Sequence, residues 1–261
     1  MQRNTKGNKM QFEKLIYGKL IKRYKRFLAD IILENGDEVT AHVPNSGAMT
    51  SCIEPNCDVW LTFHDNPKRK LKYTLELTKM AENLICTNTG VANKIAIEAI
   101  QNGVIKELQG YKSLKPEQKY GQNSRIDILL ENEDEKCFVE VKSVSLKIDD
   151  YLAFPDAVTS RGTKHLNELA QMVKDGHRAV MLYVIQRTDN LPFRLANEID
   201  KKYFEVFKEV TKNGVEVLVY QSQINLNEIY LKKAFIHHLN KEYRWGMNAV
   251  NASDREIWSK K

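Results

Sequence analysis

The stretch CFVEVKSV, residues 137–144, decides the fold. Cys137, Val139 and Val141 are apolar and alternate with the other residues, which predicts a buried β-strand. Glu140 and Lys142 lie two positions apart, so their side chains project from the same face of that strand. Two full charges on one strand face indicate either a solvated ion pair or a site that holds a metal ion and a water.

A second strand is predicted directly before it, in SRIDILL at residues 124–130. The acidic turn ENEDEK, residues 131–136, predicts that the two strands run antiparallel. Asp127 is then expected across from Glu140, on the face opposite the buried one. The residues expected on the buried face are Ile126, Ile128 and Leu130.

Two carboxylates close together repel one another unless a cation lies between them. Mg²⁺ or Mn²⁺ held by Asp127 and Glu140, with the carbonyl of Val141 as a further ligand, would activate a water to attack a phosphodiester. Lys142 would orient that water or balance charge in the transition state. A solvated Glu–Lys ion pair is the more frequent meaning of these residues taken alone, because the pattern is common by chance.

The composition indicates a globular protein with one large or two smaller cores. The chain has 261 residues, of which 42% are hydrophobic and 28% charged. No apolar run reaches the length of about 18 residues that suggests a membrane span, and the polar N-terminus is not a secretory signal, so a cytoplasmic location is expected. The four cysteines lack the spacing of a structural zinc site and are expected to be reduced thiols; they are Cys52, Cys57, Cys86 and Cys137.

The positive charge is concentrated in the first third of the chain. The net charge is +6, and residues 1–80 alone hold 14 Lys and Arg against 9 Asp and Glu. This favours a front module that binds a polyanion, although an ordinary solubilising surface explains it equally well.

Residues 14–82 are predicted to form a small closed β-barrel. They contain short alternating runs and no helix signal, and the Asn-Gly pair in ENGDE at residues 34–38 is a hairpin signal. KRYKRF at residues 22–27 interleaves basic side chains with Tyr24, a platform for a nucleic-acid base, and with Phe27, which is expected in the core. The basic residues expected to contact nucleic acid, here and in NPKRK at residues 66–70, are Lys22, Arg23, Lys25, Arg26, Lys68, Arg69 and Lys70.

From residue 83 to residue 236, predicted helices alternate with predicted strands. HRAVMLYVIQ, residues 177–186, is a near-continuous apolar run typical of a strand at a sheet centre. Residues 1–13 are predicted to be a flexible tail and residues 237–261 a polar extension. The adjacent His237 and His238 of that extension point different ways, so they are not expected to bind one metal.

Long motifs resemble the sugar fermentation stimulation protein family of bacteria and archaea. They include LIKRYKRFLADI, TAHVPNSGAM, NTGVANKIAIEAI, YGQNSRIDILL, FVEVKSVSL and FPDAVTSRGTKHLNEL, and they occur in order over nearly the whole chain. The resemblance implies an α/β fold with an N-terminal OB-fold barrel, followed by a PD-(D/E)XK nuclease-like domain with a mixed sheet flanked by helices. It also implies DNA binding, a metal-dependent nuclease-like site and a link to sugar (maltose) catabolism.

Three residues match the motif of that nuclease-like domain. Asp127 takes the first acidic place, Glu140 the second and Lys142 the lysine, while Ile126 stands where the fold usually has proline. Pro155 and Asp156 imitate the motif in FPDAV, but no Glu-x-Lys strand follows them, so Asp156 is expected in a loop.

Several other residues are candidates for the site. Glu98, on a predicted helix, is either a third metal-binding carboxylate or an exposed glutamate. Gln186 and Arg187 end the central strand, where they border a site or form an ordinary polar edge. Arg161, Lys164 and His165 open a helix predicted in TKHLNELAQMVKDG, residues 163–176; these side chains either bind a phosphate at the helix N-terminus or are simply solvated. The further candidates for DNA contact are Arg125, Arg161 and Lys164.

Two functions from different classes remain open at this point. One is a DNA-binding protein with a metal-dependent phosphodiesterase site. The other is a non-catalytic, sequence-independent DNA-binding regulator of sugar catabolism. OB-fold barrels also bind RNA, and the sequence does not separate the two nucleic acids.

Overall fold

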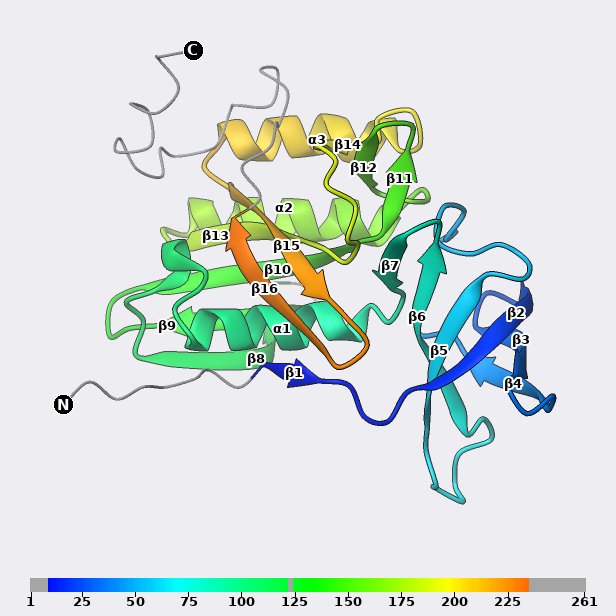
Figure 1. The fold of residues 1–261 in the computed structure, drawn as a ribbon. Helices are drawn as coiled ribbons and strands as arrows, with labels where there is room; N and C mark the ends of the chain where they lie inside the picture. The colour runs from blue at the N-terminus through cyan, green and yellow to red at the C-terminus, as the bar shows by residue number, and fades with distance from the viewer. Residues whose placement is uncertain (1–8, 122–123, 235–261) are drawn as a thin grey trace, which may run out of the picture.

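The computed structural model describes residues 9–121 and 124–234, which form two lobes (Figure 1). A β-barrel makes up one lobe, and a seven-stranded sheet covered by helices makes up the other. This is the predicted α/β architecture, and the fold class is confirmed. The predicted polar extension, with His237 and His238, lies outside the described residues.

The barrel has the strand order of an OB-fold. Its strands are β2 (Ile16–Tyr24), β3 (Leu28–Leu33), β4 (Glu38–His42), β5 (Asp58–Phe63) and β6 (Tyr73–Met80). β2 pairs with β3 and β5, β3 with β4, and β5 with β6, all antiparallel, and a short parallel pairing between β4 and β6 closes the barrel. The apolar residues that alternate along these strands pack inside it, among them Leu20, Ile31, Leu61 and Leu75.

The second lobe is built on one mixed sheet, as predicted. In spatial order its strands are β1 (Met10–Gln11), β16 (Glu228–Ala234), β15 (Glu216–Ile224), β13 (Arg178–Ile185), β10 (Lys136–Val144), β9 (Ser124–Glu131) and β8 (Ser113–Tyr120). β10, β13 and β15 are parallel, and the remaining pairs are antiparallel. β13, the predicted central strand, has only Arg178 less than fully buried.

Helices cover both faces of this sheet (Figure 1). α1 (Gly90–Gln101) buries an apolar stripe with Ile95 and Ala99 against the face that carries Val139 and Val141. α2 (Ser160–Lys174) and α3 (Lys201–Lys212) cover the other face. The two strands with the candidate site therefore run between α1 and α2.

Besides β1, four strands of this lobe were not predicted. They are β8 and a separate three-stranded sheet of β11 (Leu146–Ile148), β12 (Tyr151–Phe154) and β14 (Phe193–Leu195). β8 contains Pro116 and three charged residues, and it is tolerated because it is an edge strand with few ladder bonds to lose.

The N-terminal strand crosses from one lobe to the other. β1 lies within residues 1–13, which the sequence predicts to be a flexible tail, yet Met10 pairs with Ile229 of β16. In sequence, the barrel therefore comes after β1, the first strand of the other lobe. After the last barrel strand, β7 (Asn83–Cys86) pairs with β6 and leads to α1.

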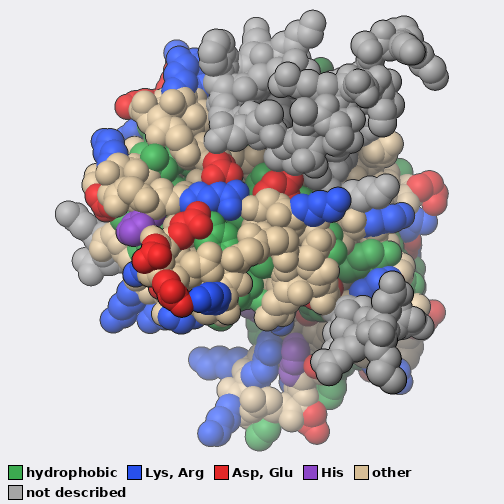
Figure 2. All heavy atoms as spheres, turned by 90° about the vertical axis from the view of Figure 1, so that its left-hand side faces the viewer, with side chains coloured by type: hydrophobic (Ala, Val, Ile, Leu, Met, Phe, Trp, Pro, Cys, Tyr) green, Lys and Arg blue, Asp and Glu red, His purple; other side chains and the backbone are tan. Residues whose placement is uncertain are grey.

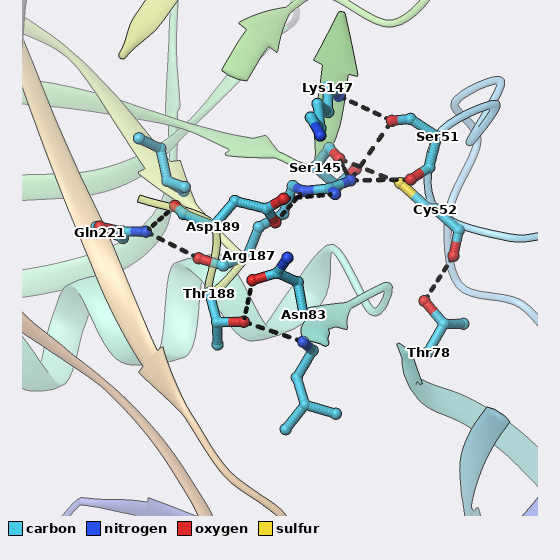
Figure 3. A network of polar contacts seen from close by, with 12 residues as sticks. Ser51, Cys52, Thr78, Asn83, Ser145, Lys147, Arg187, Thr188, Asp189 and Gln221 are labelled. Carbon is cyan, nitrogen blue, oxygen red and sulfur yellow. Dashed lines mark hydrogen bonds and ion pairs between the residues drawn. The ribbon is translucent and has the colours of Figure 1, made fainter. Parts of the chain in front are cut away.

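A buried arginine joins the lobes (Figure 3). The side chain of Arg187, directly after β13, is 2% exposed and forms an ion pair with Asp189. Its Nη1 donates to the carbonyls of Ser145, at 2.8 Å, and of Ser51, at 2.9 Å, and Ser51 belongs to the barrel. Beside it the Cys52 thiol donates to the Ser145 carbonyl. Arg187 was a candidate border residue of the site, and the structure uses it to fasten the barrel.

Candidate metal centre and nucleic-acid surface

The antiparallel pairing of β9 and β10 brings the predicted acidic residues together. The ladder runs from Lys136 and Glu131 to Val139 and Ile128, so Asp127 and Glu140 follow at its end. Beyond that point the Asp127 carboxylate replaces a backbone acceptor: its Oδ2 accepts the N–H of Val141 at 2.8 Å.

The expected arrangement of the β9 side chains is wrong in one detail. All three aliphatic residues are buried, but Ile126 packs under α2 and α3, whereas Ile128 and Leu130 pack under α1. The alternation breaks at Asp127, opposite Glu117, whose φ of 53° interrupts the β8–β9 ladder. This break lets the Asp127 carboxylate reach both Val141 and α1.

Asp127 is held in place from α1. The Asn93 side-chain amide donates to Oδ1 of Asp127 at 2.8 Å. Burial, and then the charge of Glu140, raise the pKa of Asp127 to about 6. Two neighbouring carboxylates that raise each other's energy in this way are a favourable place for a cation.

Glu140 is buried, and its two carboxylate oxygens have different surroundings. Its side chain is 3% exposed, and Oε1 accepts from Lys142 Nζ at 2.7 Å and from His165 Nδ1. Burial raises the pKa of Glu140, but attraction from Lys142 and the hydrogen bond from His165 outweigh it and hold the pKa below its usual value. Glu140 therefore stays ionised, with Oε2 buried and without a hydrogen-bond partner.

The donor set suits a hard divalent cation. Asp127 and Glu140 supply carboxylate oxygens, and the partnerless Oε2 of Glu140 is an acceptor that a cation would satisfy. Among the described residues, no group of three or more His, Cys, Asp and Glu side chains is arranged to hold a metal ion. One or two carboxylates together with several waters are a common way for proteins to bind a hard divalent cation.

The structure does not bring Glu98 to this site. Glu98 lies on the α1 face next to β1, where it accepts a hydrogen bond from the Met10 backbone and feels the charges of Lys9 and Glu228. Burial raises its pKa. Its role as a third carboxylate gains no support, because β1, near the N-terminus of the chain, packs on that side of α1.

Tyr120 and Glu168, which the sequence analysis did not name, lie near the site, and so does His165, which it named only for a phosphate at a helix start. His165 is 5% exposed, and its Nε2 accepts from Arg161 at 3.4 Å. We therefore assign the single ring proton to Nδ1, which donates to Glu140. Glu168 follows one helical turn later, and Tyr120 ends β8. Only the position of His165 and Glu168 three residues apart on one helix could have indicated a shared direction.

In the barrel, the structure divides the predicted basic residues into two groups. Arg23 donates to the carbonyls of Arg26, Asn45, Gly47 and Ala48 and so holds the loop after β4. Arg69 likewise donates to the Leu71 carbonyl and the Thr74 hydroxyl. The four hydrogen bonds of Arg23 give its guanidinium a role inside the barrel, and its contact with nucleic acid stays a prediction.

The other basic residues remain on the surface. Lys22 is exposed beside Asp30, and Lys25 and Arg26 occupy the β2–β3 turn with positive φ angles of 45° and 64°. This turn also exposes Phe27, at 44%, so the expectation that Phe27 lies in the core is wrong. Lys68 and Lys70 are exposed in the β5–β6 loop.

These two loops flank one outer row of the barrel. Leu28 pairs with His42 across β3 and β4, and His42 pairs with Thr74 of β6. Arg69, in the β5–β6 loop, is close enough to lower the pKa of His42, after burial. In Figure 2 the barrel protrudes at the bottom, where Lys and Arg side chains gather, whereas acidic and basic side chains mix over the other lobe. OB-folds bind single strands between the corresponding two loops.

The remaining basic candidates are exposed near the carboxylates. Arg125 lies on β9, two residues before Asp127, and Arg161 reaches His165. Lys164 lies 3.6 Å from Glu168. Asp156, the imitation of the motif, lies in a loop as predicted, and its Oδ2 accepts the N–H of Met49 in the barrel.

Two family models match successive parts of the chain. Residues 21–87 match a family described as the SfsA N-terminal OB domain, and residues 90–228 match the sugar fermentation stimulation protein RE domain. A homologue of the sugar fermentation stimulation protein from a Marinomonas species is 56% identical over 218 residues, 82% of this chain and 84% of its own. Another, from Pseudoalteromonas atlantica, is 51% identical over 86% of this chain and 97% of its own.

A solved structure shares both lobes. The SfsA protein of Pyrococcus furiosus, determined in complex with Ca²⁺, has a TM-score of 0.78 and 26% identity over 86% of this chain and 96% of its own. Within the described residues of our chain, no helix is long and apolar enough to cross a membrane. On these sequence and structural matches, the chain belongs to the sugar fermentation stimulation protein family.

Proposed function

We propose that this protein binds DNA through its barrel and cleaves a phosphodiester at the Asp127–Glu140 site with the help of Mg²⁺ or Mn²⁺. The observation that carries the proposal is the Glu140 carboxylate, which is ionised, buried and bonded on one oxygen only. The Ca²⁺ bound by the Pyrococcus furiosus relative supports a divalent cation in this fold. When bound, the cation would lower the pKa of a water and stabilise charge on the phosphate oxygens.

The side chains of the site have separate roles in this proposal. Asp127 and Glu140 hold the cation, with the carbonyl of Val141 as a further predicted ligand. Lys142 is 2.7 Å from Glu140 and, once the cation shares that carboxylate, is free to orient the attacking water. Asn93 and His165 keep the two carboxylates in position from the helices on either side.

The barrel would supply affinity without sequence preference. Lys25, Arg26, Lys68 and Lys70 project from the two loops and are suited to phosphates, and the exposed ring of Phe27 is suited to stacking on a base. Arg125, Arg161 and Lys164 would guide the strand across the site.

The test is a cleavage assay on labelled single-stranded and double-stranded DNA and on RNA, with Mg²⁺, Mn²⁺ or EDTA. Lys142→Ala and Glu140→Ala are compared with Glu98→Gln, a change on the α1 face that does not carry the site. We expect metal-dependent cleavage that both site variants lose and the control keeps. Binding with no cleavage under any condition would favour the non-catalytic regulator instead.

A separate binding assay tests the barrel. Lys68→Ala combined with Lys70→Ala should weaken DNA binding and reduce the salt dependence of the binding constant by about one to two units of slope. The matched control is Lys174→Ala with Lys212→Ala, two exposed lysines at the ends of α2 and α3. Equal effects of the two pairs would count against the barrel surface, and tighter binding of RNA than of DNA would change the substrate.

A further inference from the structure

Buried oxygens without partners are concentrated beside the Asp127–Glu140 pair. Among the described residues, four buried side-chain oxygen or nitrogen atoms lack a hydrogen-bond partner: Tyr120 Oη, Glu140 Oε2, Glu168 Oε2 and Gln186 Oε1. Leaving such an atom unsatisfied is unfavourable, so folded proteins contain few of them. The first three belong to neighbouring side chains.

Packing places Tyr120 next to Glu140. The Tyr120 ring stacks on Phe138, with ring centroids 5.8 Å apart and an interplanar angle of 28°. Phe138 lies two residues before Glu140 and on the same face of β10. Tyr120 is 8% exposed, and its pKa is raised by burial, by the charges of Glu140, Glu168 and Asp127, and by a side-chain interaction with Glu168, so the phenol lies near these carboxylates.

Hydrogen bonding places Glu168 in the same spot. Tyr120 pairs with Ser124 at the β8–β9 turn, and the Ser124 hydroxyl donates to Oε1 of Glu168 at 2.7 Å. Glu168 follows His165 by three residues on α2, so both side chains project toward the sheet, and His165 contacts Glu140. The second carboxylate oxygen of Glu168 is buried without a partner, although Lys164 lies 3.6 Å from the first.

We propose that Tyr120 and Glu168 belong to the cation site, where they hold waters of the divalent cation that Asp127 and Glu140 would bind. This rests on the proposed function, which assigns the cation to Asp127 and Glu140. Glu168 then supplies the acidic group on the α2 side that Glu98 does not supply from α1. A water-mediated role agrees with the absence of a three-residue ligand group from the described residues and with the hydration that Mg²⁺ retains.

The substitution Glu168→Gln distinguishes a structural role of Glu168, which would lower the unfolding temperature without the cation, from a role in cation binding, which would lower cation affinity. In Glu168→Gln the retained Oε1 can still accept from Ser124, and the new amide can donate to the neighbouring Tyr120 oxygen. Because the hydrogen bond from Ser124 is kept, we expect the cation-free protein to unfold within about 2 °C of the wild type, but to bind the cation more weakly.

The experiment measures Ca²⁺ binding by isothermal titration calorimetry, and thermal unfolding in EDTA and in Ca²⁺. Glu168→Gln should lower Ca²⁺ affinity about 10- to 100-fold, Tyr120→Phe by a smaller factor, and Glu98→Gln not at all. A Glu168→Gln variant that binds Ca²⁺ as the wild type does, or that unfolds more than about 2 °C earlier in EDTA, would overturn the inference.

A further variant separates this failure from failure of the proposed function. Glu140→Gln should lose Ca²⁺ binding whether or not Glu168 takes part. If Glu140→Gln loses binding and Glu168→Gln keeps it, only the role of Glu168 is refuted. If the wild type binds no Ca²⁺, or if Glu140→Gln binds it unchanged, both the cation site and this inference are refuted.

Discussion

Asp127→Asn should make the cation-free protein more stable at neutral pH. The pKa of Asp127 is raised from 3.8 to about 6, so the folded state binds a proton more tightly than the unfolded state does. Stability from this group is therefore fully present below about pH 4 and is lost as the pH rises through about 6. A difference of about two pKa units corresponds to about 3 kcal/mol at pH 7.5, at 1.36 kcal/mol per unit.

The asparagine can keep the local hydrogen bonds. Its oxygen would accept from the Val141 N–H, and its amide would donate to Asn93 once that side chain turns its own amide over. The expected difference in stability is thus due to the removed charge.

Urea unfolding of wild type and variant in EDTA, at intervals between pH 4 and pH 7.5, measures this difference. The free energy of unfolding of Asp127→Asn should be close to that of the wild type at pH 4 and higher by about 2–3 kcal/mol at pH 7.5. Ca²⁺ should then stabilise the wild type only. If the two pH profiles run parallel, or if the variant is less stable at pH 7.5, the argument that Asp127 is destabilised by burial and by Glu140 is refuted.

Three further predictions concern the stability of the barrel and its contacts with the second lobe. Arg187→Ala leaves Asp189 buried without its partner and should lower the free energy of unfolding by about 3–5 kcal/mol, measured by urea unfolding; a loss below 1 kcal/mol would contradict it. Arg23→Ala should lower the thermal midpoint through the loop it holds while leaving the salt dependence of DNA binding unchanged, and a reduced slope would support its contact with nucleic acid instead. Gly47→Ala places a Cβ 2.0 Å from the Asp156 carboxylate and should cost about 1–3 kcal/mol of stability in the same unfolding assay. An unchanged free energy of unfolding would contradict this prediction.

The sequence predicts the strand pair of the site because period-two alternation is a local property. Asp127, Glu140 and Lys142 could be placed on adjacent strands from spacing and one acidic turn. The partners of these residues could not be predicted in the same way. His165 and Glu168 meet the strands only because α2 crosses the sheet at that point, and a helical pattern does not contain its crossing position.

The same limit applies in the barrel, to the role of Arg23 and to the wrong expectation for Phe27. Arg23 resembles its basic neighbours in sequence, but four carbonyls from the β2–β3 turn and the loop after β4 take its donors. Phe27 follows two residues with positive φ, and this turn geometry points its ring outward. An apolar residue in an alternating run is assigned to the core until the turn type is known.

The pairing of β1 with β16 has a consequence for dissecting the protein. A fragment that starts at α1 would lack Met10 and Gln11, and the N–H and C=O groups of β16 that they cover would become an open sheet edge. Unprotected edges pair with other chains, so the isolated second lobe should be prone to aggregation. The lobe is continuous in space but not along the chain, and a circular permutant that joins residues 9–13 after β16 would be the natural way to produce it alone.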